Sequence, residues 1–360
     1  MIKLKIIVSA GGTGGHIYPA LAIINKFKEK DKNLSVLYIG THNRMEKDII
    51  PKEGIKYESL EIYGLSKTRW IRNIKNIFLI KKAMKKTEKI MKEFNPDVVI
   101  GVGGYVTYPV INVAKKLGIK TFIHEQNSIP GKTNRALAKG VDLVGVSFKN
   151  STNYFYNAKK VIYTGNPCGE DALRVPEIKP SKFGIKSKNK VILIVGGSLG
   201  SETLNNKLKT FLTLMSDEKY EFIFVTGKNK YNDFINGYEI PENVHVVDYI
   251  DHLAGLMKNV DLIISRAGAS TISEILALKL PSILIPSPYV ANNHQYYNAL
   301  DLVNLGVSEL IEEKNLNAEK LLITFNDIMN KKYDKMVENL NKLNLKSSAD
   351  IIYEEIMRLK

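Results

Sequence analysis

The chain has 360 residues, 44% hydrophobic and 25% charged, which is typical of a soluble globular protein with two domains. Its single cysteine, Cys168, excludes an intramolecular disulfide, and its six scattered histidines show no metal-binding spacing. We expect no signal peptide and no membrane-spanning segment. The net charge of +15 favours anionic partners, although solvated lysines are the plainer explanation for most of it.

Short runs rich in valine and isoleucine predict buried parallel strands along the whole chain. These runs lie at residues 5–9, 34–39, 98–101, 121–124, 143–146 and 161–164, then 191–195, 222–226, 244–247, 262–265 and 282–285. Helical patterns separate them, at residues 73–94, 109–117, 204–214 and 270–278, and from Pro19, which we place in a first helical turn. The alternation predicts an α/β protein of two doubly wound, Rossmann-like domains facing across a cleft.

A stretch containing three prolines and many lysines begins at Gly165 and separates the two sets of strands. We therefore predict a first domain over residues 1–164 and a second over residues 165–345. An amphipathic helix at 348–360 ends the sequence. We assign this helix to the first domain, although its apolar spacing alone does not determine where it packs.

Four glycine-rich turns, at residues 9–16, 101–105, 196–200 and 266–271, each end a predicted strand and open a helix. Glycine lets a ligand approach the backbone closely, and the following helix directs its first N–H groups and its positive dipole end toward the turn. Such a turn suits a phosphate or a developing oxyanion. Because two turns fall in each half of the chain, we expect a site between two similar domains.

The first of these turns ends in His16, at the start of a helix. It lacks the lysine of a P-loop, and the second strand ends at Gly40, where a dinucleotide-binding fold needs an acidic residue. The positive helix end disfavours the imidazolium, so a neutral His16 is a candidate general base. Donation to a substrate anion and simple helix capping are the alternatives.

Polar residues follow several of the predicted strands. The run His-Glu-Gln-Asn occupies residues 124–127, and an amide-rich run occupies 293–298. Ser198 opens a helix of the second half, and Glu274 lies about one turn inside another. Open α/β sheets bind ligands at the carboxyl ends of their strands. We therefore expect Ser198 to hold a pyrophosphate, Glu274 to accept from a ribose diol, and the amides to bind sugar hydroxyls.

Together, these motifs resemble those of the bacterial peptidoglycan N-acetylglucosaminyltransferases of the MurG family. They occur in the family's order, at residues 11–16, 103–105, 124–127, 165–167, 196–198, 265–274 and 294–296. The resemblance implies a GT-B glycosyltransferase fold and inverting transfer of N-acetylglucosamine from UDP-N-acetylglucosamine to undecaprenyl-pyrophosphoryl-N-acetylmuramoyl-pentapeptide in cell wall synthesis. It further implies a peripheral enzyme at the cytoplasmic face of the cell membrane, serving cell shape and division, with no cofactor, no metal and no nucleic acid partner.

The resemblance also implies roles for individual residues. The donor would contact Ser198 with its pyrophosphate, Ile250 with its uracil, Ala269, Ser270, Thr271, Ile272 and Ser273 with its phosphates, Glu274 with its ribose and Gln295 with its sugar. Thr13, Gly14, Gly15 and Asn127 would reach the donor sugar from the first domain. His16, Tyr105 and Glu125 would line the acceptor side and supply the catalytic groups.

One position departs from the family pattern. Many members have an arginine two residues after the proline of the Asn-Pro motif, and this chain has Gly169 there. The resemblance therefore implies that a contact to the uracil or to a phosphate is either missing or supplied by another cation. Arg174 and Arg266 are the candidates.

Lysine and arginine crowd residues 64–92, where Glu88 is the only acidic residue. Apolar side chains are interleaved with these cations, and such a mixture suits an anionic membrane surface. We expect a docking patch made of Trp70, Ile71, Ile77 and Phe78. The alternative is a helix with solvated lysines whose apolar stripe, at Ile74, Ile77, Met84 and Met91, faces the core. Both descriptions can hold for different faces of one helix.

Two other classes of function remain open from the sequence. Another GT-B enzyme, such as a lipid glycosyltransferase or a UDP-sugar 2-epimerase, would share the glycine-rich turns, although the run at 124–127 favours the peptidoglycan enzyme. A basic protein that binds membranes or nucleic acid would explain the net charge. Such a binding protein would not explain the glycine-rich turns, and aromatic RNA-binding signatures are absent from the sequence.

Overall fold

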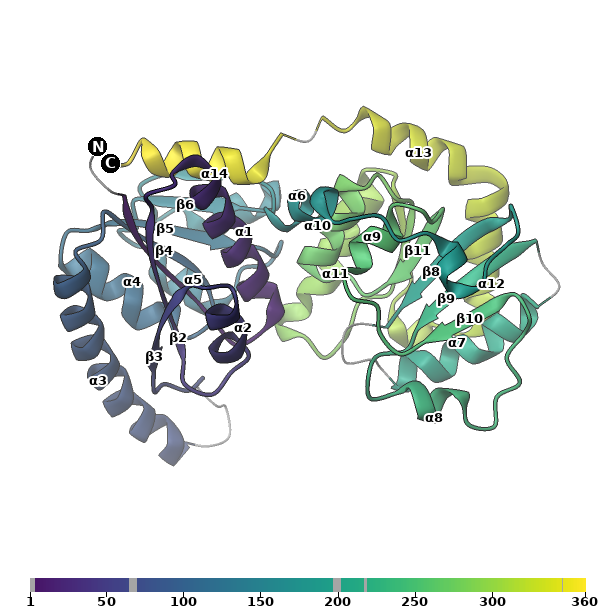
Figure 1. Cartoon of the computed structure of the whole chain (residues 1–360), viewed down its shortest axis with the longest axis horizontal. Helices are drawn as coiled ribbons and strands as arrows, with labels where there is room; N and C mark the ends of the chain where they lie inside the picture. Colours follow the sequence, from purple (N-terminus) through teal and green to yellow (C-terminus); the bar gives the residue numbers. More distant parts are fainter. Residues whose placement is uncertain (1–3, 65–69, 197–201, 217–218, 345) are drawn as a thin grey trace. The chain divides into compact units, whose positions relative to one another are not determined.

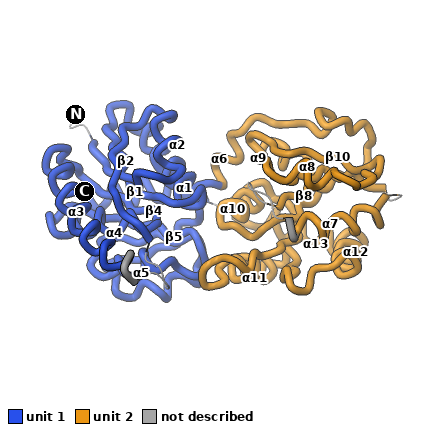
Figure 2. Tube along the Cα trace, turned by 90° about the horizontal axis from the view of Figure 1, so that it is seen from below, with its two compact units in different colours: residues 1–168, 346–360 blue, residues 169–345 orange. Residues whose placement is uncertain are grey.

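The computed structural model describes residues 4–64, 70–196, 202–216, 219–344 and 346–360, without the side chains of 70–72 and 202–203. The chain forms two compact units (Figure 2): residues 1–168 with 346–360, and residues 169–345. The division after Cys168 lies slightly beyond the boundary that we predicted at residue 164. The C-terminal helix belongs to the first unit.

The first unit is built on a seven-stranded parallel sheet with the strand order β3-β2-β1-β4-β5-β6-β7. Its strands are β1 (Lys5–Ala10), β2 (Ser35–Thr41), β3 (Lys56–Leu60), β4 (Val98–Gly103), β5 (Lys120–Glu125), β6 (Leu143–Val146) and β7 (Val161–Tyr163). Alternate residues of β1 enter two separate cores, Ile6 and Val8 one of them and Ile7 the other. The sheet is therefore buried on both faces, as its continuous apolar strands require.

Helices cover both faces of this sheet (Figure 1). They are α1 (Gly14–Lys30), α2 (Glu46–Lys52), α3 (Trp70–Phe94), α4 (Thr107–Lys116), α5 (Lys132–Leu137) and α14 (Ser348–Met357), with a 3₁₀ helix at Lys149–Phe155. Phe27 of α1 and Ile352 of α14 share one core, and Ala83 of α3 and Val110 of α4 share the other. Among the described residues, no helix has the length and apolar character to cross a membrane.

The second unit repeats this plan with a six-stranded parallel sheet in the order β10-β9-β8-β11-β12-β13. Its strands are β8 (Lys190–Val195), β9 (Tyr220–Val225), β10 (Val244–Val247), β11 (Leu262–Ser265), β12 (Ser282–Leu284) and β13 (Ser308–Leu310). Its helices include α6 (Cys168–Arg174), α7 (Glu202–Leu214), α8 (Tyr231–Ile235), α9 (Leu253–Met257), α10 (Ala269–Ala277), α11 (His294–Asn304), α12 (Ala318–Asp327) and α13 (Tyr333–Lys342). The predicted pair of doubly wound sheets is confirmed.

The helix α1 begins at Gly14, so our placement of Pro19 in its first turn was wrong. Proline at position 19 lacks the N–H that would bond to the carbonyl of residue 15, yet the helix accommodates it one turn in from its start. The glycine-rich turn itself therefore supplies the first helical residues. This places His16, rather than Pro19, in the first turn of α1.

The helix α14 is tied to α1 by ion pairs. The Asp350 carboxylate lies 3.3 Å from the Lys26 Nζ, whose side chain is only 5% exposed, and 3.2 Å from the Lys30 Nζ. The Ser347 hydroxyl donates to Asp350 Oδ2 at 2.6 Å and caps the helix. The Ser347 hydrogen bond, with the two lysines, lowers the pKa of Asp350 to about 2.

We predict that Asp350→Asn lowers the free energy of unfolding by about 1 kcal/mol at neutral pH. The effect is modest because the Asp350 side chain is 34% exposed, so water partly screens its ion pairs with the two lysines. A carboxylate whose folded pKa lies near 2 stabilises the fold above its unfolded pKa of about 4 and ceases to do so as the pH falls toward 2. Thermal melts of the variant and the wild type should therefore converge in acid. The matched control is the exposed Glu354→Gln of the same helix, whose melt should follow the wild type.

Candidate active site

The glycine-rich turns that follow β1 and β4 lie against each other. The Gly11 N–H donates to the Gly103 carbonyl at 3.2 Å. Gly12, Gly103 and Gly104 have positive φ, and a Cβ on Gly104 would lie 2.3 Å from the Gly11 carbonyl oxygen. Only glycine permits so close an approach of the two backbones. The structure therefore brings together two of the four turns that the sequence pointed to.

His16 lies half-buried in the first turn of α1, beside this contact. Its Nδ1 is 3.1 Å from the Gly11 carbonyl oxygen. Because a carbonyl can only accept, Nδ1 carries the proton, so in the neutral form of the ring the lone pair lies on Nε2. The ring packs on the Gly103 backbone, where a Cβ would lie 2.6 Å from His16 Cδ2. The arrangement holds an imidazole whose Nε2 can accept a proton.

His124, at the end of β5, is completely buried. Its Nε2 donates to the Gly165 carbonyl at 3.0 Å, and its Nδ1 accepts from the Gln126 side chain at 3.1 Å. Burial lowers the pKa of His124 to about 4, since the charged ring would lose its hydration. His124 is thus a neutral histidine that joins β5 to the segment after β7.

Glu125 is also buried, and burial raises its pKa, while hydrogen bonds from its own loop act in the opposite direction. The Asn127 N–H donates to Oε1 at 3.0 Å, and the Gly131 N–H and the Asn134 amide donate to Oε2 at 3.1 and 2.9 Å. The carboxylate thereby shapes the loop that carries Asn127. Its catalytic role stays a prediction, as does that of Tyr105, which lies half-buried against Gly64.

In the second unit, the turn after β11 opens α10, with Gly268 as the N-cap. The Ser270 Oγ is buried and has no hydrogen-bond partner among the described residues. The Ser273 hydroxyl donates to the Ser270 carbonyl at 2.7 Å, and the Ile272 side chain lies in the core. Ala269 and Thr271 lie half-buried in the same helical turn. The helix N-terminus offers backbone N–H groups to an anion, as the phosphate prediction requires.

Glu274 lies about one turn further along α10. Burial raises its pKa to about 7, because the ionised carboxylate loses hydration there. The group therefore changes charge near neutral pH. A carboxyl group with a raised pKa beside a helix N-terminus is a candidate for a binding role.

The remaining predicted donor residues fall into four situations. Ser198 lies outside the described residues. Ile250 is buried in the segment that follows β10. The Gln295 side-chain oxygen accepts the Ser287 N–H at 2.9 Å, which holds the segment before α11 and leaves the amide nitrogen to donate elsewhere. Thr13, Gly14 and Gly15, from the first unit, form the N-terminus of α1.

Gly169, the position that departs from the family pattern, packs closely on α10. A Cβ on this residue would lie 2.8 Å from the Ser273 carbonyl oxygen of α10, so an arginine would require the start of α6 to move. Arg266, one candidate for the missing cation, forms an ion pair with Glu313 at 2.6 Å and donates to the Ile285 carbonyl at 3.2 Å. This side chain is therefore already engaged in joining the loops after β11, β12 and β13.

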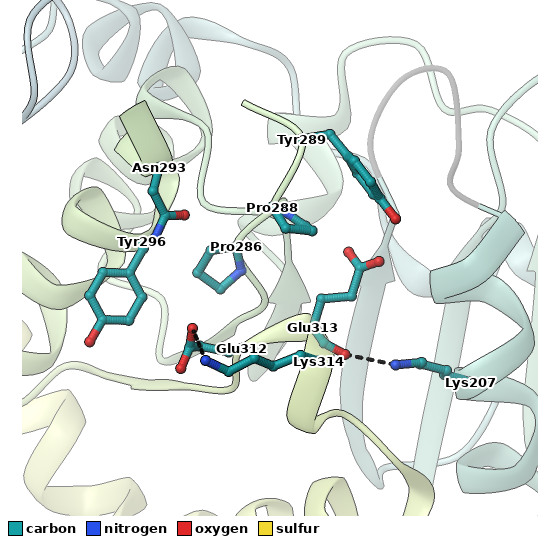
Figure 3. A pocket seen from close by; sticks show the side chains of 9 residues that line it. All are labelled: Lys207, Pro286, Pro288, Tyr289, Asn293, Tyr296, Glu312, Glu313 and Lys314. Carbon is teal, nitrogen blue, oxygen red and sulfur yellow. Dashed lines mark hydrogen bonds and ion pairs between the residues drawn. The ribbon is translucent and has the colours of Figure 1, made fainter. Parts of the chain in front are cut away.

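A pocket of about 280 Å³ opens at the carboxyl ends of β12 and β13 (Figure 3). It is lined by Lys207, Pro286, Pro288, Tyr289, Asn293, Tyr296, Glu312, Glu313 and Lys314. Lys207 Nζ donates to the Glu313 carbonyl at 2.7 Å, and Lys314 pairs with Glu312 at 3.2 Å. Of the segments that we predicted for the site, only the amide-rich run 293–298 contributes to this lining, through Asn293 and Tyr296. Within the described part of the chain, no three His, Cys, Asp or Glu side chains gather as metal ligands would.

The comparisons with known proteins agree with this architecture. The N-terminal domain of glycosyltransferase family 28 matches residues 6–146, and the C-terminal domain of that family matches residues 191–354. The chain is 43% identical, over 91% of both chains, to the UDP-N-acetylglucosamine–N-acetylmuramyl-(pentapeptide) pyrophosphoryl-undecaprenol N-acetylglucosamine transferase of Halalkalibacterium halodurans. It is 39% identical to the enzyme of the same name from Pediococcus pentosaceus over 98% of both chains.

Among solved structures, MurG of Acinetobacter baumannii is similar, with a TM-score of 0.81, 27% identity and 99% of both chains covered. Two doubly wound units with glycine-rich turns at their strand ends, matched in order by both family 28 domains, define a GT-B glycosyltransferase. The chain belongs to the MurG family, as its curated relatives and this solved structure show.

Proposed function

We propose that this glycosyltransferase moves N-acetylglucosamine from UDP-N-acetylglucosamine to undecaprenyl-pyrophosphoryl-N-acetylmuramoyl-pentapeptide, with inversion. The observation that carries the proposal is the 43% identity, over 91% of the chain, to a relative named for this transfer. The two packed glycine turns beside His16 and the open N-terminus of α10 supply the matching chemistry. The lipid glycosyltransferase and UDP-sugar 2-epimerase alternatives are not favoured, and membership in an enzyme family sets aside the non-enzyme alternative.

The reaction needs stabilisation of the departing UDP. The N–H groups at the start of α10 and the positive end of its dipole favour the charge that develops on the leaving diphosphate. Ser270, whose buried hydroxyl is unpartnered among the described residues, would donate to a phosphate oxygen. Glu274, about one turn further, would accept from the ribose hydroxyls.

The acceptor hydroxyl must lose its proton as it attacks the anomeric carbon of the donor sugar. The new C–O bond forms while the bond from that carbon to the diphosphate oxygen breaks, and the proton passes to His16 Nε2. The Gly11 carbonyl keeps the other ring nitrogen protonated, so the lone pair stays where a base needs it. His16 acting on the acceptor pyrophosphate is the second role that this position allows.

We predict that the wild-type protein transfers radiolabelled N-acetylglucosamine from UDP-N-acetylglucosamine to a lipid-linked muramoyl-pentapeptide, and that His16→Ala lowers kcat by ~10²–10⁴ if His16 is the base. The affinity for UDP should change little, because the proposed donor contacts lie mainly in the second unit. Near-wild-type turnover of a folded variant would rule out both roles of His16. Wild-type protein that transfers no sugar to this acceptor would overturn the proposed function itself.

We predict that UDP binding to the wild type weakens as the pH falls through about 7, because protonated Glu274 is a poorer acceptor for the ribose hydroxyls. Glu274→Gln should bind UDP about tenfold more weakly than the ionised wild type, the scale of a hydrogen bond to a charged group. Its affinity should also lose most of this pH dependence. Calorimetric titrations near pH 8 and pH 6 measure both effects, and equal affinities of the two proteins at each pH would remove the ribose assignment.

The helix α3 carries the features expected of a membrane-docking surface. Ile74, Ile77 and Phe78 are 48%, 51% and 68% exposed, so Ile74 and Ile77 do not belong to the core stripe considered as the alternative. Asn76, Ala83, Thr87 and Met91 form the buried stripe instead. Lys75, Lys81, Lys82 and Lys85 are exposed on the same helix. The side chains of Trp70 and Ile71 lie outside the described residues.

Apolar side chains ringed by lysines bind an anionic bilayer reversibly, each nearby cation contributing about 1 kcal/mol. The proposed acceptor keeps its lipid in the bilayer, because exposing each buried CH₂ to water costs about 0.8 kcal/mol. The enzyme therefore has to come to the membrane surface. On this reasoning we place it peripherally at the cytoplasmic face of the membrane, in contact with anionic lipid.

We predict that the double variant Ile77→Ser, Phe78→Ser binds vesicles of anionic phospholipid more weakly than the wild type while sparing transfer to a short-chain soluble acceptor. Both side chains are exposed, so folding should be unaffected. Ile323→Ser, which changes a 57% exposed isoleucine of the second unit, is the matched control and should bind like the wild type. If the double variant binds vesicles like the wild type, or if its transfer to the lipid-linked acceptor and to the soluble acceptor falls equally, the docking surface lies elsewhere.

A further inference from the structure

Glu46, in the first turn of α2, is a completely buried carboxylate that none of the sequence motifs includes. Among the described residues, no ion pair of the structure involves it. A buried carboxylate without a cation is costly unless several donors compensate it. Its position is therefore set by the groups that donate to it.

Those donors come from two other elements. Glu46 Oε1 accepts from the Thr41 N–H at 3.0 Å and from the Thr41 hydroxyl at 2.6 Å, at the end of β2. Glu46 Oε2 accepts from the Gly12 N–H at 3.2 Å, in the glycine-rich turn after β1. The carboxylate thus bridges the end of β2 to the turn that carries His16.

Small residues make room for this bridge. A Cβ on Gly11 would lie 2.5 Å from Glu46 Oε1, and a Cβ on Gly40 would lie 2.8 Å from Glu46 Cγ. Both glycines have ordinary negative φ, so conformational freedom does not explain them. The Glu46 side chain fills the space at Gly11 and shares the space at Gly40 with Tyr57, whose hydroxyl would lie 2.5 Å from a Cβ there.

The peptide bond between Gly11 and Gly12 joins Glu46 to His16. Its N–H donates to Glu46 Oε2, and its carbonyl accepts the proton of His16 Nδ1 at 3.1 Å. A negative charge at the N–H end of a peptide polarises it and strengthens its carbonyl as an acceptor. A buried acidic residue next to a catalytic histidine usually fixes the tautomer directly. Here one peptide bond stands between the two.

We propose that Glu46 is a positioning residue for the transfer reaction, holding the Gly11–Gly12 peptide so that His16 keeps its Nδ1 proton and presents Nε2 to the acceptor. This proposal rests on the proposed function, in which His16 acts on the acceptor. Glu46 touches no substrate and acts only through the peptide. Glu46→Gln would keep the size of the side chain but remove the charge and one acceptor atom.

The test compares Glu46→Gln with Asp48→Asn, which removes a second acidic charge, an exposed one, from the first turn of the same helix. We expect Glu46→Gln to lower kcat by about 10²-fold, the cost of slight misplacement of a reacting group, with the KM for UDP-N-acetylglucosamine unchanged. Asp48→Asn should behave like the wild type. Equal kcat values for the two variants would overturn the proposal, whereas a wild type without transfer activity would overturn the proposed function instead.

Introducing Glu46→Gln into His16→Ala separates positioning from general structural damage. If Glu46 acts through His16, the second change should lower the residual kcat no further, because residues that act as a unit are non-additive. If Glu46→Gln lowers kcat in His16→Ala by the same factor as in the wild type, Glu46 does not act through His16. Should Glu46→Gln fail to fold, Thr41→Val removes one donor to the same carboxylate, and its smaller loss of kcat must likewise vanish in His16→Ala.

Discussion

The contact between the backbones of Gly11 and Gly104 is the constraint on which the proposed site around His16 depends. At the carboxyl ends of β1 and β4 the two turns approach so closely that any side chain at residue 104 would strike a carbonyl oxygen. The approach leaves the Gly11 carbonyl facing the His16 ring and turns the Gly12 N–H toward Glu46. This one backbone contact therefore holds together the ends of β1 and β4, the glycine-rich turn after β1 and the His16 ring.

Buried carboxylates in the two units are held in different ways. Glu46 and Glu125 accept several backbone and side-chain hydrogen bonds, so their main effect is to fix loops. Desolvation is the cause that raises the pKa of Glu274, and no hydrogen bond to its carboxylate comes from the part of the chain that the structure describes. A group that is costly to ionise without a ligand gains most from a ligand that donates to it. The contrast concerns how each carboxylate is held: the catalytic role of Glu125 stays a prediction, and Glu46 is proposed to act through His16.

The sequence predicted much of the fold because buried parallel strands appear as continuous apolar runs. It missed β3 and β13, which lie at sheet edges and carry polar residues such as Lys56 and Glu309, so no apolar run marks them. The start of α1 was misplaced because the preference of proline for first helical turns outweighed the glycines before it.

For the site, the turns and His16 were found from glycine spacing and from the family resemblance. Glu46 and the Arg266–Glu313 pair could not be assigned in this way, since their partners are far away in the sequence. One signal did exist: Gly40 lies inside β2, which has no need of glycine, and this points to neighbours that require space, which are Tyr57 and Glu46. The sequence offers no means of naming those neighbours.

The tight packing of Gly169 on the Ser273 carbonyl bears on how this chain can evolve. An arginine at this position, which the family resemblance implies for many members, would place its Cβ against the Ser273 carbonyl oxygen. A single substitution of Gly169 by a larger residue would therefore disturb the start of α6 before the new side chain could form any contact. Accommodating a side chain here requires a prior shift of α6 away from α10, so the order in which such mutations can arise is constrained by geometry.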